Sequence, residues 1–267
     1  MTVSQDLLKT NMAGNGTGCA SNSTDTFTWE LRNVDNDSGF YVVQQNNSAS
    51  IAVISFTMNL RTSIGYVTVP DVQLNGRQSK ILVTDYHVGS STTLLYSSAD
   101  ILTYGLFDVP VLVLYLEEGQ TGEFAFKEPL SFRQYGTQID ITSAAGTSNT
   151  SSTFTRFTWI QGNGPTVLKS SNGLLVYLLD LPTAWALFAP PTTSNPNVGA
   201  NEHIFVIGPY LVRNANVIGG TVYVTGDNAN ATSLEVYVGN SFVGSINWNG
   251  QPLLTSRTAY GFSDRQN

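Results

Sequence analysis

The sequence is short of charge, and this shortage excludes one class of function. Only 12% of its 267 residues are charged, lysine occurs four times, and the formal net charge is −7. Nucleic-acid binding requires Lys or Arg side chains that replace the counterions around phosphates, so no nucleic-acid partner is expected. Long apolar runs are also missing. Since a membrane-spanning helix needs about 20 apolar residues, no membrane partner is expected either.

Cysteine and histidine are nearly absent, which limits metal chemistry. Cys19 is the only cysteine, and this excludes an internal disulfide and a cysteine-based metal site. His87 and His203 are the only histidines and belong to different predicted units. A zinc site would therefore need carboxylates from elsewhere in the chain. We expect no metal and no cofactor.

The N-terminal residues MTVSQDLLKT lack the positive and apolar regions of a signal peptide. A chain that starts here is expected to be cytoplasmic, whereas an excerpt of a longer secreted chain would be secreted with it. Six Asn-x-Ser/Thr glycosylation acceptors give mild support to a secreted ancestor. They are Asn15, Asn22, Asn36, Asn46, Asn149 and Asn230.

What the sequence does contain is typical of a β protein. Ser, Thr and Asn are frequent, there are 24 glycines, and apolar residues alternate with polar ones in many short runs. Three segments are predicted as β-hairpins: residues 27–46, residues 72–89 around Asn75-Gly76, and residues 109–126. The first strand of the third segment is apolar on both faces, so we expect it to be covered on both sides. Strands do not alternate with amphipathic helices, which excludes a (β/α)₈ barrel.

The most hydrophobic segment, residues 173–191, combines two predicted elements. A buried strand ends near Asp180, and a short helix spans Pro182 to Phe188. A turn-rich stretch follows, and then about six strands at the spacing of a small sandwich. We therefore predict an all-β fold in three parts, which are an irregular N-terminal arm (1–25), a large antiparallel β domain (26–195) and a small β-sandwich (196–267).

Residues that suggest catalysis are few, and each also has a structural interpretation. Glu30 and Asp180 lie in strongly patterned segments and are weak candidates for a catalytic acid, although such acids are more often structural. Asp85 and His87 are two positions apart on one strand face. No Gly-x-Ser-x-Gly elbow accompanies them, which favours a structural pair at a strand end.

Other motifs favour structural interpretations as well. Residues 35–39 (DNDSG) resemble the start of a calcium loop, but their glycine comes too early, which favours a turn built on Asx side-chain bonds. The glycine-rich residues 14–19 follow no strand and begin no helix, which disfavours a phosphate site. Glu117 and Glu118 are expected at a solvated strand end. Core packing is expected for the tryptophans, with sugar stacking as the alternative; they are Trp29, Trp159, Trp185 and Trp248.

Several long segments resemble, in the same order, the second and third domains of fungal family 35 β-galactosidases. They include LNGRQSKILVTDY (74–86), VLVLYLEEGQTGEFAF (111–126), LLVYLLDLPTAWALFAPP (174–191) and GPYLVRNANVIGGTVYVTGDNANATSLEVYVG (208–239). The resemblance runs from about residue 5 to residue 261.

The resemblance implies a fold and a limit on function. In that family a (β/α)₈ barrel carries both catalytic glutamates. The second domain is a large antiparallel structure with an immunoglobulin-like subdomain and one short helix, and the third is a small β-sandwich. Since the barrel is not in this sequence, no catalytic residue of the family can be carried over to it. We expect β-rich accessory domains that are non-catalytic alone.

Partners and two alternative functions stay open at this point. An isolated copy of such domains would expose an apolar patch, which predicts either a homo-oligomer or a barrel-type partner. The first alternative is a standalone isomerase or cyclase that acts on a hydrophobic small molecule, with Glu30 or Asp180 as proton donor. It requires a closed pocket with one buried acid. The second is a lectin-like sugar-binding module, which requires an exposed aromatic platform.

Overall fold

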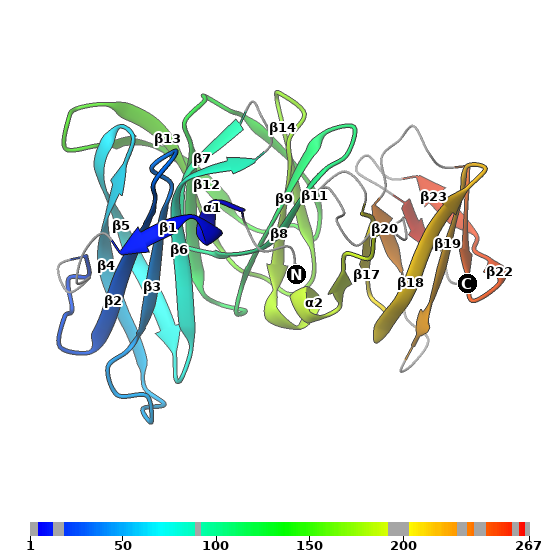
Figure 1. The fold of residues 1–267 in the computed structure, drawn as a ribbon, viewed down its shortest axis with the longest axis horizontal. Helices are drawn as coiled ribbons and strands as arrows, with labels where there is room; N and C mark the ends of the chain where they lie inside the picture. The colour runs from blue at the N-terminus through cyan, green and yellow to red at the C-terminus, as the bar shows by residue number, and fades with distance from the viewer. Residues whose placement is uncertain are drawn as a thin grey trace.

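The computed structural model describes residues 5–12, 19–88, 92–191, 203–228, 234–237, 244–257 and 262–264. Regular structure in these residues is almost entirely β, as predicted. The helices are short, α1 (Gln5–Leu8) and α2 (Leu181–Trp185). The strands form layers that follow one another along the longest axis of the molecule (Figure 1).

The larger N-terminal part contains two sheets and a ribbon. In spatial order, the described strands of sheet 1 are β1 (Thr10–Met12), β2 (Thr26–Asn33), β3 (Gly39–Gln45), β6 (Ser79–Val88), β7 (Thr92–Ser97), β10 (Thr121–Phe126), β13 (Thr153–Ile160) and β12 (Ile141–Thr147). Those of sheet 2 are β11 (Phe132–Gly136), β14 (Thr166–Ser170), β15 (Leu175–Asp180), β9 (Pro110–Leu116) and β8 (Asp100–Leu106). The ribbon pairs β4 (Val53–Thr62) with β5 (Gly65–Asn75).

The smaller C-terminal part contains two further sheets. The described strands of sheet 3 are β16 (Leu187–Phe188), β17 (Phe205–Ile207), β20 (Glu235–Tyr237), β24 (Phe262–Asp264) and β23 (Thr255–Arg257). Those of sheet 4 are β18 (Leu211–Ile218), β19 (Thr221–Asp227), β21 (Ser245–Trp248) and β22 (Gln251–Pro252). Pairing is antiparallel throughout the described strands except for β15 with β9 and β19 with β21.

Alternation along the strands builds a separate core on each face of sheet 1. Phe40 and Tyr41 are neighbours on β3, yet Phe40 packs between sheets 1 and 2, whereas Tyr41 packs beneath the ribbon. The apolar strand β9 contributes to cores on both of its faces. Leu112 packs toward sheet 1, and Val111 packs toward the C-terminal part. The prediction that this strand is covered on both sides is confirmed.

Two of the three predicted hairpins are wrong in their pairing, although their strands exist. Residues 27–46 form the antiparallel pair β2–β3 as predicted. In residues 72–88, Gly76 has a positive φ of 56°, but the turn leads from the ribbon into sheet 1, where β6 pairs with β3 and β7. In residues 109–126, β9 belongs to sheet 2 and β10 to sheet 1. Each of these turns connects two layers of the structure, because the strands on its two sides bury their apolar side chains in different hydrophobic cores.

The predicted helix is correct in place and too long in extent. Residues 181–185 form one helical turn with a proline in its first turn, but Leu187 and Phe188 pair with Ile207 and Val206. The last residues of the apolar segment thus join sheet 3.

Residues 1–25 were expected as an irregular arm, and their described portion includes α1 and β1, with β1 paired to β2. The predicted boundary between residues 195 and 196 lies outside the described residues.

Candidate functional site

A polar network lies between sheet 1 and the β4–β5 ribbon, and it contains the candidate acid Glu30. Nε of the nearly buried Arg32 donates to Oε1 of Glu30 at 2.7 Å. Nη2 of Arg32 donates to the Tyr41 hydroxyl at 2.6 Å and to the Arg61 carbonyl at 2.7 Å, and Nη1 donates to the Asp37 carbonyl at 2.7 Å. Glu30 is therefore held as the partner of a buried cation.

Tyr41 closes this network. Its hydroxyl donates to Oε1 of Glu30 at 3.2 Å and accepts from the Arg61 backbone N–H at 2.9 Å. Burial raises the pKa of Tyr41, so the phenol stays protonated at neutral pH. These bonds hold β2, β3 and β4 together, so the role of the network is structural.

The network opens into a shallow polar pocket of about 590 Å³. At its rim Nη2 of Arg61 contacts both carboxylate oxygens of Asp37, at 2.6 and 2.8 Å. Asp37 lies in the DNDSG turn, where Asn33 Oδ1 accepts the backbone N–H of Asp35, and Asp37 itself has a φ of 61°. The prediction of an Asx-type turn is confirmed. The charges at this rim neutralise one another.

Asp180, the second candidate acid, lies elsewhere. It ends β15 in sheet 2, is 1% exposed, and its Oδ1 accepts the Gly164 backbone N–H at 3.2 Å. Glu30 lies in sheet 1 on the face toward the ribbon. The structure therefore places the two candidates in different sheets and does not combine them into one site.

Asp85 and His87 have different surroundings. Asp85 is buried, has a φ of 51°, and accepts the backbone N–H and the hydroxyl of Ser63 at 2.8 and 2.6 Å. Burial raises the pKa of Asp85. His87 is exposed. Ser63 lies in the turn of the β4–β5 ribbon, so Asp85 fastens the ribbon to sheet 1.

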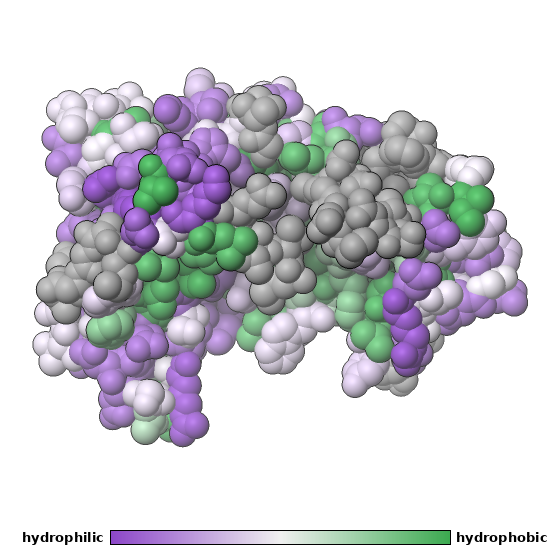
Figure 2. All heavy atoms as spheres, in the orientation of Figure 1, coloured by the Kyte–Doolittle hydropathy of each residue, from purple (hydrophilic) through white to green (hydrophobic). Residues whose placement is uncertain are grey.

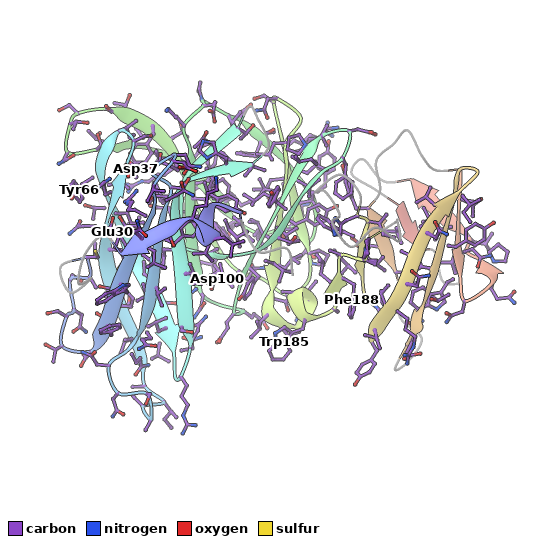
Figure 3. All side chains as sticks on the ribbon, in the orientation of Figure 1. Glu30, Asp37, Tyr66, Asp100, Trp185 and Phe188 are labelled. Atoms are coloured by element: carbon purple, nitrogen blue, oxygen red, sulfur yellow. The ribbon has the colours of Figure 1, made fainter. Side chains whose placement is uncertain are left out.

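Two buried acids were not identified from the sequence. Oδ1 of Asp100 accepts the Ile81 N–H at 2.8 Å, and burial raises its pKa to about 6, against the opposing effect of Lys80. Glu123 is buried and accepts the Tyr96 hydroxyl at 2.8 Å. Asp100 follows a turn and Glu123 alternates with apolar residues, patterns that exposed acids share, so the sequence carried no signal for their burial. Figure 3 shows Asp100 apart from Glu30 and Asp37.

The tryptophans divide between core and surface. Trp159 and Trp248 are buried, Trp29 is half-buried, and Trp185, the last residue of α2, is 75% exposed. A groove of about 310 Å³ at the open end of sheets 1 and 2 is apolar with a hydroxyl and amide rim. Its lining holds no titratable side chain, and it consists of Leu130, Ser131, Phe132, Gln134, Ile141, Ser143, Thr155, Phe157 and Leu168.

The described part of the chain contains no group of three or more His, Cys, Asp or Glu side chains that could hold a metal ion. Within the same residues, none of the helices has the length and apolar character needed to cross a membrane.

Comparison with protein families accounts for nearly the whole chain. The family model described as "Beta-galactosidase, domain 2" matches residues 7–187, and the one described as "Beta-galactosidase, domain 3" matches residues 188–263. The chain belongs to the beta-galactosidase domain 2 and domain 3 families. Their junction at residues 187 and 188 falls within β16, where the helical turn α2 gives way to sheet 3.

Curated fungal relatives agree with this assignment. The chain is 55% identical to a probable beta-galactosidase C of Aspergillus fumigatus and 57% identical to one of Sclerotinia sclerotiorum, each over 261 residues. A probable beta-galactosidase C of Penicillium rubens is 53% identical over 262 residues. Each match covers 97% of this chain and 26% of the relative, so the chain spans about a quarter of the length of these relatives. The chain thus corresponds to β-rich accessory domains of fungal beta-galactosidases.

The glycosylation acceptors of these beta-galactosidase domains differ in their surroundings. Asn46 and Asn149 are exposed, but Asn46 donates to the Thr24 carbonyl at 2.8 Å, and Asn149 accepts the Tyr66 N–H at 2.8 Å. Asn36 accepts the N–H of the buried Ser38 at 3.1 Å, and Asn22 donates to Asp25 at 2.9 Å. Asn15 and Asn230 lie outside the described residues. Glycosylation at these positions stays a prediction.

Proposed function

We propose that this chain is a non-catalytic accessory region of a fungal beta-galactosidase, in which it supports a catalytic domain. The match of domains 2 and 3 to a quarter of each relative carries this proposal. The chemistry of the site supports it. Retaining hydrolysis of a galactoside needs two carboxyl groups about 5 Å apart, whereas Glu30 and Asp180 belong to different sheets and each is engaged in structural bonds.

The alternative of a small-molecule enzyme has less support. A proton-transfer site requires a titratable group in a closed cavity. The 310 Å³ groove contains no titratable group, and the 590 Å³ pocket is polar and contains internally paired charges. The lectin-like alternative requires an exposed aromatic platform, and of the four tryptophans only Trp185 is mostly exposed.

Activity measurements test the proposal directly. The 267-residue chain alone is expected not to hydrolyse nitrophenyl galactoside, and galactose or lactose is expected to leave its melting temperature unchanged. A chimera in which this chain replaces the matching quarter of the Sclerotinia sclerotiorum relative is expected to fold and hydrolyse that substrate. Turnover by the chain alone that is lost in Glu30→Gln or Asp180→Asn would contradict the proposal.

A further inference from the structure

Strand β12 (Ile141–Thr147) forms one outer edge of sheet 1, and this edge is unprotected. It pairs with β13 over seven consecutive residues without a bulge, and no other described strand pairs with its opposite side. The sequence has no charged side chain and no proline between Asp140 and Arg156. Figure 2 shows mostly pale side chains, of intermediate hydropathy, at the upper left corner, where the turn between β12 and β13 lies. Bulges, prolines and charges normally keep the sheet edges of two molecules apart, and the β12 edge has none of them.

The other long edges among the described strands are interrupted or covered. β8 is bulged at Leu102, and β18 is bulged at Arg213. In the ribbon, β5 contains Pro70, and the backbone of β4 bonds to residues 19–21. The remaining edge strands of the described sheets have five residues or fewer. The β12 edge is therefore the place where this chain is most open to pairing with another strand.

The phase of the β12–β13 ladder shows which backbone groups point outward. Just beyond the strand, the N–H of Ser148 donates to the carbonyl of Ser152 at 2.9 Å. Hydrogen-bonded residues alternate along an antiparallel pair. The even-numbered residues of β12 therefore bond to β13, and the odd-numbered ones direct their N–H and C=O groups away from the sheet.

A second copy of β12 fits these outward groups. In an antiparallel pair centred on a two-fold axis beside Ala144, Ile141 of each copy faces Thr147 of the other. Ser143 faces Ala145 in the same arrangement. The odd-numbered residues then exchange about eight N–H···O bonds, and the two Ala144 residues form the closely spaced pair in which no hydrogen bond is exchanged. The edge is thus complementary to itself, and it carries no charges that would repel each other.

An apolar groove lies along the inner face of this edge. The groove of about 310 Å³ is bounded by Ile141 and Ser143 of β12 and by Phe132 of β11, the facing edge strand of sheet 2. The two-fold axis of an antiparallel edge pair stands perpendicular to the sheet, so the grooves of both copies lie on the same face of the continued sheet. Each copy therefore adds cover beside the groove of the other, which removes apolar surface from water.

We propose that two copies of this chain associate through the β12 edge, so that sheet 1 of one copy continues into sheet 1 of the other. This association goes beyond the proposed function and does not depend on it. A seven-residue strand is about 23 Å long and a sheet is about 10 Å thick, so the edge offers roughly 230 Å². A typical stable complex buries roughly 800 Å² per partner. We therefore expect a reversible dimer with a dissociation constant of about 1–100 µM.

Analytical ultracentrifugation of the 267-residue chain from about 1 to 200 µM tests whether the dimer forms. A reversible equilibrium between monomer and dimer is expected within this range. A chain that stays monomeric at about 200 µM would overturn the inference. Growth beyond the dimer would overturn it as well, because pairing through one two-fold axis is closed.

A substitution on the axis tests whether β12 forms the contact. Ala144→Glu places a carboxylate directly opposite Arg156 of β13, which the single chain tolerates, but it brings two carboxylates together in the dimer. It is expected to weaken dimerisation at least tenfold without lowering the melting temperature of the monomer. Ala49→Glu, the same change at an exposed alanine in the turn before the ribbon, is expected to leave dimerisation unchanged. Equal effects of the two substitutions would overturn the inference.

Residue-resolved hydrogen exchange gives a second readout that needs no substitution. The outward amides of Ser143 and Ala145 are expected to exchange at least tenfold more slowly at a concentration where the dimer predominates than in the monomer. The amides of Thr142 and Ala144, which bond to β13, serve as the internal reference and are expected to be protected at both concentrations. A dimer in which Ser143 and Ala145 exchange as fast as in the monomer would assign the contact to another surface and overturn the inference.

Discussion

Arg32 stabilises the joint between sheet 1 and the ribbon, because its guanidinium donates to four oxygen atoms there. It satisfies Glu30, Tyr41 and two backbone carbonyls from a position that is 6% exposed. Removal of one member of a buried ion pair leaves the other charge without compensation, which typically costs about 3–5 kcal/mol. The Arg32→Met variant is therefore expected to lose about 3 kcal/mol in denaturant unfolding. Arg213→Met, which removes an exposed pair with Asp227, is the control and should lose no more than about 1 kcal/mol; similar losses would contradict the argument.

Asp100 makes stability depend on pH in an unusual direction. Burial raises its pKa from 3.8 to about 6 in the folded chain, so the folded state retains a proton that the unfolded state has lost. This contribution is complete below about pH 4 and is lost as the pH rises through about 6. The free energy of unfolding of the native chain, relative to Asp100→Asn, should fall by about 2–3 kcal/mol between pH 4 and pH 7. Denaturant melts of both proteins across that range measure it, and a constant difference would refute it.

At this scale the sequence could place candidate acids on strands but could not identify their partners. The alternation around Glu30 correctly located it on a strand of the first hairpin. Its hydrogen-bond partners, Arg32 and Tyr41, are in turn bonded to the backbone of Arg61, which is distant in sequence and on another layer. Such contacts depend on which sheets stack, and local patterns carry no information about stacking.

Among the elements, β10 and β13 depend on a glycine beneath an aromatic ring. Gly122 lies directly opposite Trp159, and a Cβ at this glycine would approach Trp159 Cζ2 to 2.4 Å. The indole cannot move aside easily, because it is buried and its Nε1 donates to Gln161 at 3.0 Å. Gly122→Ala is thus expected to destabilise the chain by about 1–3 kcal/mol in thermal or denaturant unfolding. Gly244→Ala, where the nearest other atom would be 3.9 Å away, should be nearly neutral, and equal effects would contradict the steric argument.

Strand identity was predictable at the element scale, whereas strand pairing was predictable only in part. Residues 27–46 pair locally because their turn returns β3 to the edge of β2. Asn75-Gly76 supplies an equally good turn signal, yet β5 remains with β4 and β6 crosses to sheet 1. A turn motif fixes the direction of the backbone over a few residues. The partner of a strand is set by which core its apolar face completes, and that core is assembled from distant segments.

Across the whole molecule, the two beta-galactosidase domains share a core and are expected to unfold together. Phe205 and Tyr237 of sheet 3 pack with Val111, Val113 and Tyr177 of sheet 2. The ring of Phe107 lies 5.1 Å from that of Phe205, nearly at right angles. A buried aromatic interface of this kind couples the stability of its two sides. Differential scanning calorimetry of the chain should therefore show one transition, with equal calorimetric and van't Hoff enthalpies.

Substitution at this shared core should separate the two domains. Phe205→Ala removes the ring that sheet 3 presents to sheet 2 and is expected to split the transition in two. Val222→Ala removes two methyl groups from the internal core of the smaller domain. Because that core does not include sheet 2, the substitution should lower the melting temperature while a single transition remains. Two transitions in the native chain, or one in Phe205→Ala, would show that the domains are not coupled through this core.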